Sequence, residues 1–165
     1  MKKLLILSAL VLLMSSCLFA DVTWSTFQSE DFNIQFDIPD NWTTESKDDE
    51  TVPTFFATNP KQDIALVLLI YKDESISTEE LFDQAVDNLD MELEGEAEQT
   101  EINGLDAWLG IGAGVIEGEA AGIVIMAATY DENNYVAYIF TEADAFEKRA
   151  EIMEQIINSF APIEE

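Results

Sequence analysis

The stretch that decides the fold is residues 103–140, which read NGLDAWLGIGAGVIEGEAAGIVIMAATYDENNYVAYIF. Three polar pairs, Asn103-Gly104, Glu117-Gly118 and Asn133-Asn134, separate its long apolar runs. Asn-Gly favours a type I′ hairpin because both central residues take φ > 0, and the other two pairs can adopt this geometry less readily. The three turns predict a meander of four consecutive antiparallel strands, of which the first is expected at residues 97–102.

A terminal helix is expected to close this meander. Thr141 can act as its N-cap, and acidic residues follow in the first turn, where the helix dipole favours them. Pro162 prevents the helix from continuing. Apolar residues recur at helical spacing, which predicts that one helix face docks on the sheet: Phe146, Ala150, Met153, Ile157 and Phe160.

The second strand of the meander has an unusual distribution of glycine. Alternation places Gly110, Gly112 and Gly114 on one face beside Trp108. The opposite face carries Leu105, Ala107, Leu109, Ile111, Ala113 and Val115. Glycines in a strand mark a bend or the close approach of another backbone or a ligand. We expect close helix packing or a bend here, with a shallow ligand groove beneath Trp108 as the alternative.

Further strands are predicted before the meander, at residues 23–28, 32–38, 42–45 and 54–58. The second of these alternates most clearly, with an apolar face formed by Phe32, Ile34, Phe36 and Ile38. Residues 64–71 are apolar at every position, which is typical of a central strand that is covered on both faces. The sequence therefore predicts three layers.

A helix is expected to begin at Ser77 and to end at Gly95. Ser77 and Glu80 have the spacing of a capping box, in which each side chain binds the backbone amide of the other residue. The apolar stripe of this helix predicts packing on the core rather than a cofactor groove, and it contains Leu81, Phe82, Ala85, Val86, Leu89 and Leu93.

The N-terminus has the features of an export signal over residues 1–20. Lys2 and Lys3 precede an apolar run that is shorter than the ~20 residues needed to cross a bilayer. Two cleavage sites compete. The sequence Leu-Met-Ser-Ser-Cys ending at Cys17 resembles a bacterial lipobox, in which Cys17 would carry the lipid, and this interpretation is preferred. Cleavage after Ala20 would instead release a soluble protein. Either way we expect one domain over residues 21–165, exported to the cell envelope and either membrane-anchored or periplasmic or extracellular.

The charge of the chain is strongly negative. With 34 acidic and 7 basic residues the net charge is −27, and removal of Lys2 and Lys3 leaves 5 − 34 = −29. Such a surface repels nucleic acid and anionic lipid, and it attracts cations or basic partner surfaces. Solubility at high ionic strength would explain the same composition without a partner.

Few catalytic chemistries are open to this chain. It has no histidine, and its single cysteine, Cys17, lies in the export signal, which excludes Ser-His-Asp and Cys-His catalysis and histidine metal ligation. A hydrolase that uses two carboxylates remains an alternative. Weak calcium binding is a second alternative, at Asp131, Glu132, Asn133 and Asn134, although an ordinary turn explains these residues as well. No residue is assigned to a catalytic, cofactor or metal site.

One stretch, Phe32-Asn33-Ile34-Gln35-Phe36-Asp37-Ile38-Pro39-Asp40-Asn41-Trp42, resembles the N-terminal motif of the PsbP and Mog-type family. The Asn103-Gly104 hairpin and the terminal helix are similar to that family too, so the resemblance covers nearly all of residues 21–165. The resemblance implies an α+β fold, a mainly antiparallel sheet with helices packed on it in an α/β/α sandwich. It also implies a non-catalytic protein without a cofactor, similar to bacterial envelope lipoproteins, that binds another envelope protein.

Overall fold

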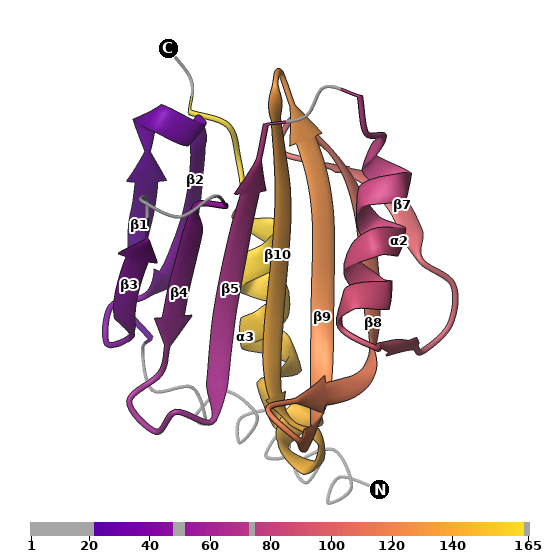
Figure 1. The fold of residues 1–165 in the computed structure, drawn as a ribbon. Coiled ribbons are helices and arrows are strands. Elements are labelled where there is room, and N and C mark those ends of the chain that lie inside the picture. The colour runs from indigo at the N-terminus through magenta and orange to yellow at the C-terminus, as the bar shows by residue number, and fades with distance from the viewer. Residues whose placement is uncertain (1–21, 48–51, 73–74, 164–165) are drawn as a thin grey trace, which may run out of the picture.

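The computed structural model describes residues 22–47, 52–72 and 75–163. These residues form an eight-stranded sheet, a separate two-stranded hairpin and two α-helices (Figure 1). The strands are β1 (Trp24–Ser29), β2 (Ile34–Pro39), β3 (Thr43–Lys47), β4 (Thr54–Thr58), β5 (Ile64–Tyr71), β6 (Glu92–Leu93), β7 (Glu98–Ile102), β8 (Leu105–Ile116), β9 (Glu119–Tyr130) and β10 (Asn133–Glu142). The helices are α2 (Thr78–Asn88) and α3 (Phe146–Asn158), with short 3₁₀ turns η1 (Glu30–Phe32) and η2 (Ala143–Ala145).

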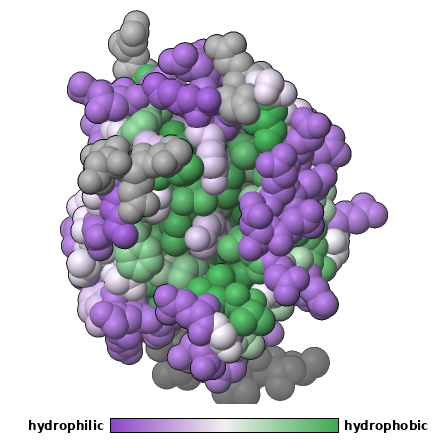
Figure 2. All heavy atoms as spheres, viewed as in Figure 1, coloured by the Kyte–Doolittle hydropathy of each residue, from purple (hydrophilic) through white to green (hydrophobic). Residues whose placement is uncertain are grey.

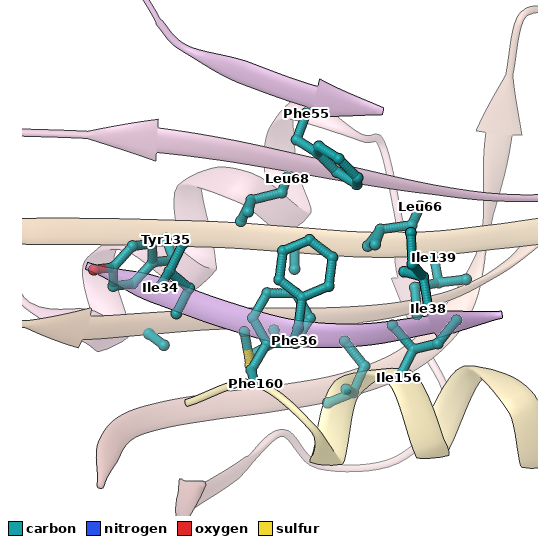
Figure 3. Packing of buried hydrophobic residues seen from close by; sticks show 14 of the residues in the cluster. Ile34, Phe36, Ile38, Phe55, Leu66, Leu68, Tyr135, Ile139, Ile156 and Phe160 are labelled. Carbon is teal, nitrogen blue, oxygen red and sulfur yellow. The ribbon is translucent and has the colours of Figure 1, made fainter. Parts of the chain in front are cut away.

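The sheet has the order β3-β4-β5-β10-β9-β8-β6, and β7 also pairs with β8. Every pairing is antiparallel. In Figure 1, α2 lies in front of the sheet near β8 and β9, whereas α3 lies behind it. The β1–β2 hairpin shares the α3 side, where Phe36 packs between Phe55 of β4 and Phe160, at ring-centroid distances of 5.3 Å and 4.4 Å (Figure 3). The predicted α+β sandwich with a mainly antiparallel sheet is confirmed.

Strand β5 packs against apolar side chains on both faces, as its sequence predicts, but its α2 face is covered only in part. Leu66 and Leu68 belong to the larger core between the sheet, the β1–β2 hairpin and α3. Leu69 and Tyr71 pack against the smaller core beneath α2. The alternation predicted for β2 is also confirmed, although the strand begins at Ile34 because the preceding residues form η1.

The meander of β7, β8, β9 and β10 is confirmed, but its third turn lies two residues earlier than predicted. Asn103 and Gly104 take φ of 48° and 91°, and Glu117 and Gly118 take 53° and 90°, as type I′ turns require. The third turn falls instead at Asp131 and Glu132. Asn133 and Asn134 pair with Tyr130 and Thr129 across the ladder because each further ladder position provides backbone hydrogen bonds.

Helix α2 starts as predicted and ends earlier. The capping box between Ser77 and Glu80 is present, with the Glu80 amide donating to Ser77 Oγ over 3.2 Å. The prediction that the helix ends at Gly95 is wrong. The chain leaves the helix at Leu89, Asp90 takes φ of 47°, and Leu93 pairs with β8 as part of β6. Pairing with the free edge of β8 replaces helical hydrogen bonds with strand hydrogen bonds.

The predicted N-cap of the terminal helix is also wrong. Thr141 is buried in β10 and donates its hydroxyl to the carbonyl oxygen of Asp63 over 2.6 Å. The turn η2 then leads into α3, whose N-cap residue, Ala145, offers no side-chain bond. Met153 and Ile157 of the predicted stripe are buried, and Ile156, which the predicted stripe did not include, is buried beside them. Among the described residues, no helix has both the length and the apolar content that a bilayer crossing requires.

Candidate functional site

The main candidate site is a groove between α2 and the strands β5 and β10, which we call the α2 groove. Figure 2 shows an apolar strip on this face, bordered by hydrophilic residues along α2 and along the opposite margin. The groove has a volume of about 420 Å³. It exists because α2 packs over β8, β9 and the near side of β10, and no other helix of the described residues lies above the same sheet face over β4 and β5.

The strand side of the groove is built from alternate residues. Leu69 of β5 lies opposite Val136 of β10, and Val67 lies opposite Tyr138. Tyr71 continues this row at the end of β5, and Leu69, Tyr71, Val136 and Tyr138 all line the groove. The two tyrosines give the floor large apolar rings with polar hydroxyl groups.

The helix side of the groove follows the period of α2. Leu81 and Ala85 contribute apolar surface at a spacing of four residues. Gln84 and Asn88, also four residues apart, bring exposed amide groups to the rim. The groove therefore combines an apolar floor with amide groups that can donate or accept hydrogen bonds.

Burial affects the ionisation of the tyrosines in the groove. Loss of hydration raises the pKa of Tyr71 above its usual range. The same effect, supplemented by the nearby Tyr71, raises the pKa of Tyr138. Both phenols are therefore neutral at physiological pH and keep a hydrogen-bond donor.

The glycine face of β8 is filled by other parts of the chain. A Cβ atom at Gly112 would lie 2.1 Å from the backbone oxygen of Glu92, and one at Gly110 would lie 2.8 Å from atoms of both Leu93 and Phe82. The expectation of close packing is confirmed, but helix α2 approaches only through Phe82 at Gly110, and at Gly112 the element that approaches is strand β6. The alternative of a ligand groove beneath Trp108 is wrong because the backbone of β6 and the side chains of Leu93 and Phe82 occupy the space.

The residues considered for calcium do not face one common surface. Asp131 and Glu132 are exposed at the β9–β10 turn, whereas Asn133 and Asn134 are buried in β10. Lys72 approaches Glu132, with 3.9 Å between the ammonium nitrogen and the carboxylate oxygen. In the described part of the chain, no three acidic side chains gather in a way that could hold a metal ion.

Among the described residues, two carboxyl groups have shifted pKa values, and both hold parts of the fold together through hydrogen bonds. Hydrogen bonds from Ser25 and Thr23 lower the pKa of Asp40. Burial opposes the charge of Asp63, but hydrogen bonds from Arg149, at 2.6 Å, and from Asn59 outweigh it and lower the pKa of Asp63. The general acid of a glycosidase needs a raised pKa, so neither group has the property that a two-carboxylate hydrolase requires.

Comparison with known proteins identifies the fold. The chain is similar to the solution structure of cyanobacterial PsbP (CyanoP) from Synechocystis sp. PCC 6803, with a TM-score of 0.67, 12% identity, and 90% of this chain and 98% of the other covered. It is also similar to PA94 from Pseudomonas aeruginosa, described as a protein of unknown function and putative regulator, with a TM-score of 0.56, 13% identity, and coverage of 86% and 99%.

A third similar structure comes from Bacteroides thetaiotaomicron, with a TM-score of 0.56, 15% identity, and 85% of this chain and 48% of the other covered. No protein-family model matches the sequence, and a search of curated proteins finds no match. At such low identity these similarities establish a PsbP-like fold, and the resemblance expected from the sequence is confirmed at that level.

The sequence did not indicate the α2 groove. Leu69 and Tyr71 belong to a run that the sequence predicts to be covered on both faces, and Val136 and Tyr138 belong to the last predicted strand of the meander. The available signal was the number of helices, because two predicted helices, each about 10 Å wide, cannot cover both faces of a sheet whose many strands lie about 4.8 Å apart.

Proposed function

We propose that this chain is a non-catalytic, exported protein of the bacterial envelope that binds another envelope protein through the α2 groove. The observation that carries the proposal is the open apolar groove itself, on a sheet face that α2 covers only in part. Exposed apolar strips with polar borders are typical of binding sites. The PsbP-like fold agrees with the family resemblance, whose members are expected to bind proteins.

The chemistry of the groove suits a protein segment. Tyr71 and Tyr138 offer broad rings with few rotatable bonds, and tyrosine is enriched in the buried centres of protein interfaces. Gln84 and Asn88 can pair with the backbone of a bound segment. A partner side chain that enters the groove would remove apolar surface from water on both sides of the interface.

Crosslinking from two matched positions tests this proposal. Gln84 lies on the rim of the α2 groove, and Gln155 is also an exposed glutamine, on α3 at the opposite face. A photoreactive phenylalanine analogue replaces each in turn in growing cells. A discrete adduct from position 84 that is absent from position 155 is the expected result. Equal adducts from both positions, or none from position 84, would contradict a specific site in the groove.

Attachment to the membrane through Cys17 is part of the same proposal. Cys17 lies outside the described residues, and residues 18–23 separate it from β1, a length that spans at most about 20 Å when fully extended. A lipid at Cys17 would therefore keep the domain close to the membrane surface. Cys17→Ala, or globomycin, should change the processed mass and release the protein from membranes. An unchanged mass and membrane partition would exclude the lipid anchor.

A further inference from the structure

The face of the sheet opposite α2 has a second open apolar area, on the outer half of β8. Large apolar residues that are exposed among the described residues are few, namely Val22, Phe56, Ile111 and Val115. Ile111 and Val115 point to the same face of β8 and are 46% and 57% exposed. Val124 and Ala120 lie beside them on β9. A continuous apolar strip is therefore left in water.

The position of α3 explains why this strip is open. α3 packs over β9 and β10 and leaves the outer half of β8 uncovered. Its first residue, Phe146, lies so close to Gly122 of β9 that a Cβ atom at Gly122 would be 2.3 Å from the ring. Gly122 pairs with Ala113, so this contact fixes the start of the helix directly beside the exposed strip.

The strip runs into a groove of about 340 Å³ between β8 and α3, which we call the β8–α3 groove. Its floor is apolar and contains Leu109, Ile111, Val124 and Phe146. Its rim is acidic and contains Glu94, Glu96 and Glu98 from the β6–β7 region, and Glu154 from α3. All four glutamates are exposed, and no lysine or arginine of the described chain lines the groove.

We propose that the β8–α3 groove docks a basic, amphipathic segment of a partner protein. A large apolar side chain of the segment would cover Ile111 and Phe146, and flanking lysine or arginine residues would face the four glutamates. Charge complementarity selects this occupant. A second copy of the chain would be repelled because it carries the same large negative charge. Anionic lipid would be repelled for the same reason.

This docking surface goes beyond the function proposed for the α2 groove. It lies on the opposite face of the sheet and uses different residues. A crosslink from Gln84 and binding at Ile111 can therefore succeed or fail independently.

The test titrates the full chain, purified as the cell processes it, with a short labelled peptide of alternating lysine and leucine. Fluorescence anisotropy gives the affinity. Because a buried isoleucine contributes enough apolar surface for about a tenfold effect, Ile111→Gln should weaken binding about tenfold. Because Ile111 is half exposed, the thermal midpoint of the Ile111→Gln protein should stay near that of the wild type. A peptide with glutamine in place of lysine should bind at least about tenfold more weakly than the lysine peptide.

Matched charge changes separate the groove from general attraction to an acidic protein. Glu96→Gln with Glu98→Gln removes two charges at the rim, and Glu79→Gln with Asp83→Asn removes two exposed charges on α2. The rim pair should weaken the lysine peptide about tenfold, and the α2 pair less than about twofold. Equal losses from the two pairs, or an unchanged affinity for Ile111→Gln, would overturn the proposal. A dimer in sedimentation that Ile111→Gln converts to monomer would also overturn it, in favour of a self-association surface.

Discussion

Position 112 requires glycine because the backbone of β6 leaves no room for a side chain there. The oxygen of Glu92 occupies the space that any side chain at Gly112 would need, and it is a backbone atom that cannot rotate away. Gly112→Val should therefore lower the free energy of unfolding by about 1–3 kcal/mol or more. Urea denaturation measures the change. Ala113→Val is the matched control because residue 113 is exposed on the other face of β8, and it should stay within about 0.5 kcal/mol. A Gly112→Val protein as stable as this control would show that β6 does not approach β8 so closely.

Asp63 couples stability to acid pH. Because the pKa of Asp63 is lowered in the fold, its ionised form stabilises the protein above the unfolded pKa near 3.9, and this contribution is lost as pH falls through the folded pKa. Asp63→Asn should cost about 1 kcal/mol at neutral pH, since the partly exposed Arg149 pair is screened by solvent. The stability difference from wild type should shrink below about pH 4. A difference that is independent of pH would show that Asp63 acts without its charge.

At the scale of elements, the sequence predicted best where one pattern acted alone. The capping box at Ser77, the alternation in β2 and the apolar run of β5 each specify a local structure that tertiary contacts also favour. The errors lie where neighbouring strands compete with local preference. Asn133 and Asn134 prefer turns, and Leu93 continues a helical stripe, but all three join strand ladders. The outcome depends on which strand edges of the folded sheet are free to pair, and a single sequence does not show those edges.

The candidate site was less predictable than the fold for a related reason. The α2 groove exists because one helix, which runs along the strands, is narrower than the sheet beneath it, so no single residue marks it. The row of Leu69 and Val136 forms because β10 pairs with β5. These two strands are far apart in the sequence, so their pairing is hard to predict from it. The apolar side of β8 reads as core in sequence, yet Ile111 and Val115 are exposed because α3 stops short of them.

Asn103 links two elements, and its substitution tests that link. Its side-chain amide donates to the carbonyl oxygens of Asn158 and Phe160, both at 2.9 Å, so the β7–β8 turn binds the end of α3. Asn103→Gly keeps the positive φ but removes these bonds, and it should cost about 1–2 kcal/mol. Hydrogen exchange should show faster opening in the last turn of α3. Unchanged protection there would mean that the turn does not hold the helix.

The whole molecule carries a negative charge that opposes its own folding. The chain has 34 acidic residues, none of those that the structure describes is buried, and only two ion pairs are present among the described residues. The repulsion is screened over about 10 Å at 0.1 M salt. The urea midpoint should therefore rise from low to moderate NaCl concentration. A urea midpoint that stays constant or falls would show that charge repulsion does not contribute much to the stability of the fold.

Partner binding at the α2 groove depends on the apolar rings of its floor. The most direct measurement repeats the crosslink from Gln84 in a chain with Tyr71→Gln, which removes one ring from the groove at the end of β5. Val115→Gln is the control because it makes the same kind of change on the opposite face. We expect Tyr71→Gln to abolish the adduct while Val115→Gln leaves it unchanged, with both proteins folded by circular dichroism. An adduct that persists in Tyr71→Gln at the wild-type level would show that the partner does not bind in the α2 groove.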